Sequence, residues 1–418
     1  MSDVVKSTRL PQWKSSAGPV TAAPQQARPS WWLRRLLQRL QRAGISRIHL
    51  RWVDGAEFSL GVSLPGVAQP RVAINQRRAI RRGIRGGLLG WAEGYMAGDW
   101  DCDDLHALTD WAMANEQRLE QAFTGSPLSA WLHRLLHRLN ANSKRGSRRN
   151  IAFHYDLGND FYRLWLDPTM TYSSALFASP GQSLEQAQRN KYQTIANMLG
   201  VSPGDRVLEI GCGWGGMAEH LLQQHDVSWH GITLSQQQLL WCQQRLAGFA
   251  GRAEASLTDY RDLAEQQYDA IVSIEMLEAV GEEHWPQYFA TLRRCLKPGG
   301  YAVIQVITIA DERFAAYRQR ADFIQRYIFP GGMLPSPTAM SEQIAAAGLH
   351  LVLEDGFGDD YARTLRYWHQ AFNSQWPALQ QQGFDERFRR MWNYYLAYCE
   401  SGFRAGSIDV RFYLLRNP

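Results

Sequence analysis

Apolar positions recur with helical spacing near the start of the chain. In "SWWLRRLLQRLQRAG", residues 30–44, the leucines fall on one row of a helix and the arginines lie off it: Leu33, Leu36, Leu37 and Leu40 against Arg34, Arg35, Arg39 and Arg42. This pattern predicts a basic amphipathic helix, which either packs on its own domain or contacts a membrane. The preceding residues, 1–29, are rich in Ser, Pro, Gln and Ala and predict a disordered tail.

A period-two alternation follows in "IHLRWVDGAEFSLGV", where Asp54 and Gly55 separate two short runs. This arrangement predicts a β-hairpin. A helical pattern then extends through "GWAEGYMAGDWDCDDLHALTDWAM". We therefore expect a smaller, mainly helical N-terminal domain over residues 30–139. The Gly-, Ser- and Arg-rich residues 140–149 read as a linker, and a catalytic domain is expected over residues 150–418.

Arginines crowd the stretch "QRRAIRRGIRGG" at five of nine positions: Arg77, Arg78, Arg81, Arg82 and Arg85. Such a cluster is either a solvated face or a surface that meets an anion. Nothing nearby resembles a module that reads nucleic-acid bases. We therefore expect an anionic membrane surface as the partner and no nucleic acid.

The second half of the chain alternates short apolar strands with helical segments. "GDRVLEIGCGWGGMAEHLLQQ" is a strand, a turn with glycines at 211, 213, 215 and 216, and a helix. "YDAIVSIEMLEAVG", "LRRCLKPGGYAVIQVITI" and "SIDVRFYLLRN" supply later strands in order. This series predicts an α/β fold with a mostly parallel, seven-stranded, Rossmann-like sheet.

A glycine-rich turn between a strand and a helix permits two kinds of cofactor. A dinucleotide site needs an acidic residue about 20 positions further on to hold a ribose, and "VSWHGITLS" contains none. The ordered series favours the class I fold of S-adenosylmethionine-dependent methyltransferases. In that fold, "LTDYRDL" places Asp259 and Tyr260 where adenine contacts are usual.

Length and composition narrow the setting. The chain has 418 residues, of which 45% are hydrophobic, so it can fill the cores of two or three domains. No apolar run reaches the roughly 18 residues that span a bilayer, and we expect a cytoplasmic protein that associates peripherally with the inner face of the membrane. The five cysteines are widely spaced without a CxxC pair. This spacing suggests reduced thiols and neither a disulfide framework nor a metal site.

Several motifs together resemble the cyclopropane fatty acid synthase family, which includes the mycolic acid cyclopropane synthases and related fatty acid methyltransferases. The motifs are "GYMAGDWDCDDL", "HYDLGNDFYRLWLDPTMTYSS", "VLEIGCGWGG", "GITLSQQQ", "QRYIFPGGMLPS", "DYARTLRYW" and "YYLAYCESGFRAG". They cover roughly residues 85–415 in the order of the family. A single motif would be weak, whereas this series is specific.

The resemblance implies a set of residues around the cofactor. Tyr172 and Ser173 would approach S-adenosylmethionine from a flap that starts near His154. The glycine turn would hold its methionine end through Gly211 and Gly213. The ribose would be held by Thr233 and Gln238, which explains the missing acidic residue.

The resemblance also implies how the reaction ends. A double bond is a weak nucleophile, so the methyl donor must be held in line and water excluded from the cation that forms. In the family a bound bicarbonate then removes a proton. Glu278, Tyr361 and the backbone of Ile307 fill three positions of that anion site.

Three other positions of the anion site differ from the family pattern. Ser174 stands for a cysteine, Ala279 for a histidine, and Gln305 for the histidine that holds the anion. Ser174 can contribute its backbone N–H and Gln305 its side-chain amide. Cys399 matches a cysteine of the family and is equally compatible with simple packing.

The expected function is transfer of a methylene unit from S-adenosylmethionine to the cis double bond of an unsaturated acyl chain in a membrane phospholipid, which forms a cyclopropane. One alternative keeps the methyl transfer and gives a methyl-branched or methylene product without a ring. Another is a non-catalytic lipid-binding protein. The sequence leaves open the acyl length, the double-bond position, the head group and the oligomeric state, for which a homodimer is one option.

Overall fold

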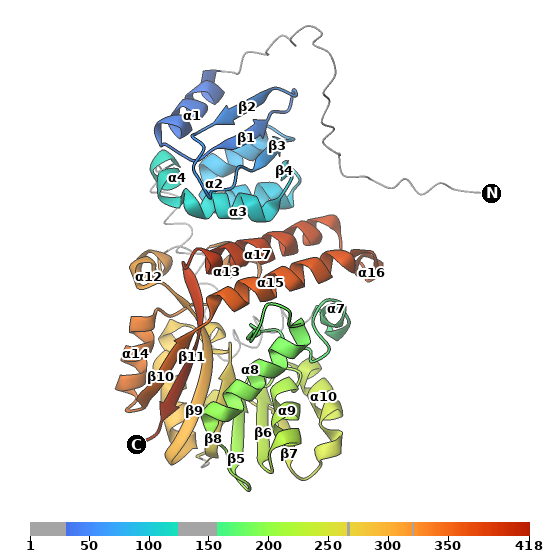
Figure 1. The fold of residues 1–418 in the computed structure, drawn as a ribbon, viewed down its shortest axis with the longest axis vertical. Helices are drawn as coiled ribbons and strands as arrows, with labels where there is room; N and C mark the ends of the chain where they lie inside the picture. Colours follow the sequence, from blue (N-terminus) through green and yellow to red (C-terminus); the bar gives the residue numbers. More distant parts are fainter. Residues whose placement is uncertain (1–30, 124–156, 266–267, 320–321) are drawn as a thin grey trace, which may run out of the picture.

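The structure, a computed structural model of the chain, describes residues 31–123, 157–265, 268–319 and 322–418. The expected tail, the linker and the domain boundary at residue 150 lie outside these ranges. No helix in the described ranges is both long and apolar enough to cross a membrane. Figure 1 shows an N-terminal part stacked on a larger α/β part, with helices α15 and α17 between them.

The described N-terminal part, residues 31–123, contains a four-stranded sheet and four helices. Its elements are α1 (Trp31–Arg42), β1 (Ile48–Arg51), β2 (Glu57–Leu60), β3 (Arg71–Ile74), α2 (Arg78–Met96), β4 (Trp100–Cys102), α3 (Leu105–Ala114) and α4 (Glu116–Phe123). The strands run in the order β2-β1-β3-β4. The predicted hairpin is confirmed, because β1 and β2 pair antiparallel and Gly55 has a φ of 86° in the turn.

Helix α1 packs on its own domain, which was one of the two interpretations of its pattern. Leu37 and Leu40 are half-buried against the core. Arg34, Arg35 and Arg39 are exposed on the other side. The described part of the apolar row, Leu37 and Leu40, is therefore used for packing within the N-terminal part.

Helix α2 carries the arginine cluster, which divides into two groups. Arg78 and Arg82 form ion pairs with the buried carboxylate of Asp99, at 2.6 and 3.2 Å. The remaining arginines, Arg77, Arg81 and Arg85, are exposed. The spacing of these three places them on one face of the helix, ahead of a kink at Gly87, which has non-helical φ and ψ.

The larger part contains the predicted seven-stranded sheet, in the order β10-β11-β9-β8-β5-β6-β7. Its strands are β5 (Arg206–Ile210), β6 (Ser228–Thr233), β7 (Ala253–Leu257), β8 (Tyr268–Ile274), β9 (Leu296–Ile309), β10 (His350–Gly356) and β11 (Ile408–Arg416). Strands β5 to β9 pair in parallel, and β11 pairs antiparallel with both β9 and β10. The predicted fold class is therefore confirmed.

Helices flank this sheet and cover its upper edge (Figure 1). They are α7 (Asn159–Arg163), α8 (Leu184–Leu199), α9 (Gly216–Gln224), α10 (Gln236–Arg245), α11 (Trp285–Cys295), α12 (Asp311–Tyr317), α13 (Phe323–Tyr327), α14 (Pro337–Ala346), α15 (Gly358–Ser374), α16 (Trp376–Gln381) and α17 (Glu386–Arg404). Four short 3-10 helices lie between strands: η1 (Ala247–Phe249), η2 (Tyr260–Asp262), η3 (Leu277–Ala279) and η4 (Glu282–His284). Parallel strands bring η2 and η3 to the same edge of the sheet.

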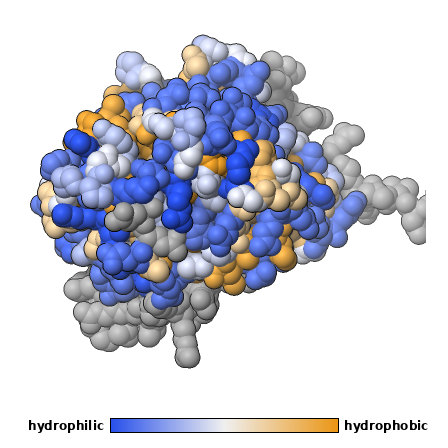
Figure 2. All heavy atoms as spheres, turned by 90° about the horizontal axis from the view of Figure 1, so that it is seen from below, coloured by the Kyte–Doolittle hydropathy of each residue, from blue (hydrophilic) through white to orange (hydrophobic). Residues whose placement is uncertain are grey.

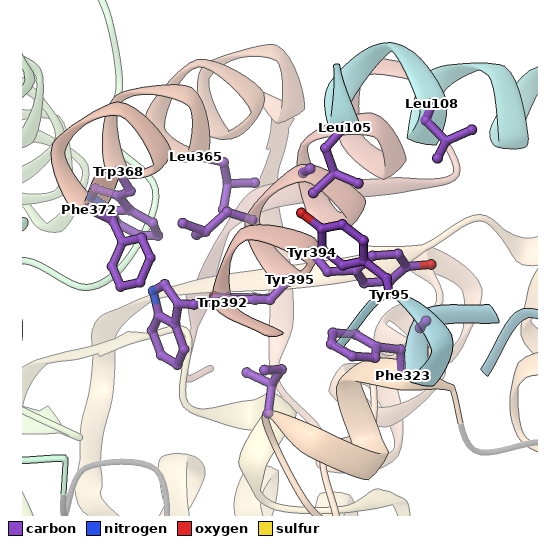
Figure 3. Close-up of a cluster of buried hydrophobic side chains, with 14 of the residues drawn as sticks. Tyr95, Leu105, Leu108, Phe323, Leu365, Trp368, Phe372, Trp392, Tyr394 and Tyr395 are labelled. Carbon is purple, nitrogen blue, oxygen red and sulfur yellow. The ribbon is translucent and has the colours of Figure 1, made fainter. Parts of the chain in front are cut away.

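Helix α17 joins the two parts through an aromatic core (Figure 3). The ring of Tyr394 lies 6.0 Å from that of Tyr95 of α2 and 4.8 Å from that of Phe323. Arg390 donates from Nε to the carbonyl of Tyr95 and from Nη2 to that of Trp100. The motif "GYMAGDWDCDDL" thus contains residues of the N-terminal part that bind α17.

Figure 2 shows the end of the molecule that lies farthest from the N-terminal part. This surface is mostly hydrophilic, and its apolar atoms gather in separate patches among polar ones. The prediction of a membrane-contacting surface concerns the N-terminal part, where exposed arginines cluster.

Candidate active site

The glycine turn lies between β5 and α9, as the pattern predicted. Gly211, Gly213 and Gly215 have φ values of 84°, 52° and 79°, in the region that favours glycine. A Cβ on Gly216 would lie 2.6 Å from the hydroxyl of Tyr192, whereas a Cβ on Gly213 would project into open space. The turn thus borders a hollow that a larger side chain at position 213 would fill.

A cavity opens at this turn and collects most of the residues predicted to bind the cofactor. Its lining comes from the glycine turn, the end of β6, η2, the end of β8 and the segment 170–173. The predicted residues in the lining are Tyr172, Ser173, Gly211, Gly213, Thr233, Gln238 and Tyr260. These residue types and the open space at Gly213 fit an elongated polar ligand such as S-adenosylmethionine.

Asp259 differs from the other predicted cofactor residues. It is absent from the cavity lining, and its buried carboxylate forms an ion pair with Arg261 at 2.7 Å. The same carboxylate accepts the backbone N–H of Arg261 and caps η2. Asp259 therefore positions the segment that carries Tyr260.

The flap, whose described part is residues 157–177, covers the cavity. The hydroxyl of Tyr172 lies 2.9 Å from that of Tyr395 on α17. Gln188 of α8 donates to the carbonyl of Ser173, and Lys191 of α8 donates to its hydroxyl, over 2.9 and 2.6 Å. His154, the expected start of the flap, lies outside the described residues.

Glu275 occupies the centre of the site and was missed by the sequence analysis. It directly follows β8, and its backbone has a φ of 50°, which is rare for a residue other than glycine. Its Oε1 accepts the backbone N–H of Ser174 at 2.8 Å and the amide of Gln305 at 2.7 Å. Its Oε2 accepts the hydroxyl of Tyr361 at 2.7 Å.

These three donors are among the groups that the sequence analysis assigned to an external anion; the backbone N–H of Ile307 was a fourth donor in that set. Glu275 fills their acceptor position with a carboxylate of the chain itself. Burial raises the pKa of Glu275, while Lys191 and the three hydrogen bonds counteract the rise. Bicarbonate at this place stays a prediction that requires Glu275 to move. A carboxylate directly after a parallel strand, in "SIEM", was the signal that could have revealed it.

Glu278 lies in η3 beside this arrangement. The backbone N–H of Ile307 donates to its Oε1. Its Oε2 is buried and has no hydrogen-bond partner among the residues that the structure describes. Burial, followed by the charge of Glu275, raises the pKa of Glu278 to about 8. The side chain can therefore exchange a proton near neutral pH.

Tyr361 and Cys399 complete the predicted set. Tyr361 of α15 stacks on Phe403 with a centroid distance of 4.4 Å, and burial raises its pKa well above its usual range. Cys399 of α17 packs against the aromatic core and does not line the cavity. Burial also raises the pKa of Cys399, so this thiol is no ready nucleophile.

Aromatic rings wall the site on the side of α15 and α17. Tyr172 lies 5.1 Å from Trp368 and 5.3 Å from Tyr162 between ring centroids. Trp165 lies 5.6 Å from Tyr172. Such a wall excludes water and offers aromatic faces to a cation.

Comparison with known proteins places this arrangement among lipid-modifying enzymes. A family model described as mycolic acid cyclopropane synthetase matches residues 142–413. The tuberculostearic acid methyltransferase UfaA1 of Mycobacterium tuberculosis is 39% identical over 391 residues, which cover 90% of this chain and 89% of that protein. The cyclopropane-fatty-acyl-phospholipid synthase of Escherichia coli is 36% identical over 354 residues, covering 84% of this chain and 88% of the relative.

Solved structures agree with these matches. The cyclopropane synthase MmaA2 from Mycobacterium tuberculosis superposes with a TM-score of 0.61 at 32% identity. The mycolic acid cyclopropane synthase CmaA1, complexed with SAH and CTAB, gives a TM-score of 0.60 at 32% identity. Each superposition covers 64% of this chain and 98% of the chain of the solved structure.

Proposed function

The chain belongs to the mycolic acid cyclopropane synthetase family and is an S-adenosylmethionine-dependent methyltransferase, and from this premise we propose that it methylates the double bond of an unsaturated acyl chain in a membrane phospholipid, with Glu275 as the proton acceptor. Membership in an enzyme family argues against the purely lipid-binding alternative. One observation supports the role of Glu275: its carboxylate accepts hydrogen bonds from Ser174, Gln305 and Tyr361.

S-adenosylmethionine supplies an electrophilic methyl group when it is bound. The residues of the cavity lining would hold it, with Gly211 and Gly213 at the turn, Thr233 at the end of β6 and Gln238 in α10. The aromatic wall would keep water from the acyl chain. These residues position the two reactants, which is a large part of what catalysis needs when the nucleophile is weak.

The chemistry after methyl transfer depends on a base. The π electrons of the double bond form the new C–C bond, and the neighbouring carbon becomes a cation. A proton must then leave the chain, and its C–H electrons neutralise the cation. Glu275 is held next to the flap by three hydrogen bonds and can take this proton as an ionised carboxylate.

We favour a ring-free, methyl-branched or methylene product. The expectation of a cyclopropane rested on an external anion, and Glu275 occupies the place expected for it. Cyclopropane formation is the second candidate. It is supported by Glu278, which accepts the N–H of Ile307, and by Tyr361, which donates to the nearby Glu275.

Product analysis tests this choice. Purified protein would receive S-adenosylmethionine and vesicles of dioleoyl phosphatidylglycerol, and the product acyl chains would be separated by chromatography. Mild catalytic hydrogenation saturates an alkene and spares a cyclopropane. We expect products that take up hydrogen, no dependence on added bicarbonate, and a loss of about 100-fold or more in Glu275→Gln. Products that resist hydrogenation and require bicarbonate would favour the second candidate.

The N-terminal part would bring the enzyme to its substrate. Arg77 at the N-cap of α2 is exposed on the same face as Arg81 and Arg85 in the helix. Two large apolar side chains of α2, Ile84 and Leu88, are 54% and 53% exposed near them. Arginines near an anionic bilayer contribute on the order of 1 kcal/mol each. Exposed apolar side chains beside them add affinity for the interface. This surface supports a peripheral location at the membrane.

A further inference from the structure

Lys191 is a fully buried lysine that neither the sequence analysis nor the reaction described above uses. It lies in the middle of α8, and its side chain has no exposed surface. Helix α8 is held at both ends, by a capping box between Ser183 and Gln186 and by Gly200 in the left-handed conformation. The position of Lys191 is therefore fixed by the helix.

The ammonium of Lys191 is directed at the flap. Its Nζ donates to the hydroxyl of Ser173 over 2.6 Å, and Ser173 lines the cofactor cavity. One turn earlier, Gln188 holds the carbonyl of the same serine at 2.9 Å. The next residue, Ser174, donates its N–H to Glu275. A shift of Ser173 would therefore disturb both the cavity wall and the acceptor.

Three carboxylates on different elements act on Lys191 through their charge, and each raises its pKa: Glu275 after β8, Asp167 of the flap and Glu209 of β5. All three also accept hydrogen bonds from other groups, and those of Glu275 are described above. Glu209 accepts the indole N–H of Trp229 at 2.9 Å, and Asp167 accepts the backbone N–H of Thr169 at 2.9 Å. Of the three charges, that of Glu275 raises the pKa of Lys191 most, and Glu275 is also the proposed proton acceptor.

A buried ammonium without a negative partner is costly, and so is a buried carboxylate without a positive one. Among the groups that lower the pKa of Glu275, Lys191 has the largest effect, and it acts through its positive charge. The other groups facing Glu275 are the neutral donors of Ser174, Tyr361 and Gln305, and the acidic Glu278. Glu275 therefore depends on Lys191 for charge balance.

We propose that Lys191 is a positioning residue of the reaction: its ammonium holds the Ser173 hydroxyl at the wall of the cofactor cavity and keeps the Glu275 carboxylate ionised, ready to accept a proton. This inference rests on the proposed role of Glu275. Burial lowers the pKa of Lys191 to about 7, so its charge changes near neutral pH. The proposal also implies that activity depends on the protonation states of both Lys191 and Glu275.

Replacement of Lys191 separates this role from a structural one. Lys191→Met removes the charge and the hydrogen bond, and Lys191→Gln removes the charge while keeping a donor. Without the positive charge, the pKa of Glu275 rises, so a larger share of it carries a proton at pH 7. We expect the acidic limb of the kcat profile to move up by about one pH unit or more in both variants, with at least an about tenfold loss at pH 7 that diminishes at higher pH.

Two further variants locate the effect. Ser173→Ala keeps the charge and removes the hydrogen-bond acceptor, and we expect a raised KM for S-adenosylmethionine with an unchanged pH profile. Lys297→Met is the control, because Lys297 pairs with Asp269 at the far end of β9 and is partly exposed. It should behave as the parent. Calorimetric binding of S-adenosylhomocysteine would verify that each variant is folded.

The outcomes distinguish this inference from the proposed function. Suppose that Glu275→Gln abolishes turnover of dioleoyl phosphatidylglycerol vesicles and both Lys191 variants keep the parent's pH profile. Glu275 then remains the proposed base, and the proposed role of Lys191 is wrong. A uniform loss at every pH in both Lys191 variants would also overturn it, because that result marks a structural residue. If Glu275→Gln keeps most of its activity, the proposed base itself fails.

Discussion

The side-chain Nε2 of Gln305 donates to Oε1 of Glu275 over 2.7 Å, so a carboxylate of this chain accepts the amide hydrogen where an external anion was expected. Gln305 stands at the position of a histidine in the family that the motifs resemble. A neutral amide beside Glu275 adds no positive charge. The charge that balances Glu275 must therefore come from another direction, and α8 provides it through Lys191.

Removal of the Glu275 side chain should recreate a site for an external anion. Glu275→Gly also relieves a backbone with φ of 50°. We expect low activity in buffer without bicarbonate, and an increase of about tenfold when bicarbonate is added, because the donors of Ser174, Gln305 and Tyr361 become available. The assay is formation of S-adenosylhomocysteine with phospholipid vesicles. Glu275→Gln is the matched control, since it fills the space, and bicarbonate rescue of that variant would contradict the interpretation.

Gly213→Val should abolish binding of S-adenosylmethionine. The φ of 52° disfavours a β-branched residue, and the new side chain would project into the open space of the cavity. Calorimetry with S-adenosylhomocysteine measures the loss, for which we expect at least an about 100-fold weaker Kd. Gly248→Ala, at an open position in η1 outside the cavity lining, serves as the control. Undiminished affinity in Gly213→Val would remove the glycine turn from the site.

Stability should decline as pH rises because of Glu278. Its pKa is raised from the ordinary value of 4.5 to about 8 in the folded chain, so the folded state holds a proton that the unfolded state has released. Stability from this group is fully present below pH 4.5 and is lost as pH rises to about 8. The loss amounts to at most ~5 kcal/mol, since the pKa rises from 4.5 to about 8 and one pKa unit is ~1.4 kcal/mol.

Urea unfolding of the parent and of Glu278→Gln at pH 5 and pH 8 isolates this contribution, because Lys191 and Glu275 titrate in both proteins. The parent should lose more stability than the variant between these two pH values. An equal loss in both would show that Glu278 is not the buried acid described above.

Binding to anionic vesicles should depend on the exposed arginine face of α2. Replacement of Arg77, Arg81 and Arg85 by Glu should lower sedimentation with phosphatidylglycerol vesicles by about tenfold or more, and added salt should weaken the parent's binding. A control variant with Arg163, Arg189 and Arg387 changed to Glu has the same net charge and alters exposed arginines of the larger part. Equal losses in the two triple variants would leave α2 without a special role.

The pattern of apolar and polar positions predicted the sheet because its strands are short, apolar and separated by clear turns. The strand–turn–helix at Gly211 and the final strand, β11, lie where the pattern placed them. The resemblance to a family, which rests on ordered motifs, collected seven of the eight proposed cofactor residues at one cavity. Asp259 was the exception. It forms an ion pair with Arg261, and no pattern in the sequence predicts that ion pair.

The charged centre of the site was less accessible to prediction. Glu278 matched a family position and drew attention away from Glu275, three residues earlier in the same segment. Lys191 occupies the buried side of α8 together with Ala187 and Ile195, at spacings of four. A lysine in an apolar row is a recognisable signal. Its partner Glu275, however, follows a strand far away in the sequence, and the two are brought together only by the folded sheet.

Helix α17 has a consequence for the modularity of this enzyme. The solved relatives MmaA2 and CmaA1 match 64% of this chain with nearly their whole length, so enzymes of this kind exist at a smaller size. In the present chain the same helix binds the N-terminal part through Arg390 and reaches the flap through Tyr395, whose hydroxyl meets Tyr172. Cutting the chain before the larger part would expose Tyr394 and loosen the support of the flap at once. The smaller relatives are therefore poor guides for trimming this protein, and an engineer who exchanges the N-terminal part must redesign the outward face of α17 as well.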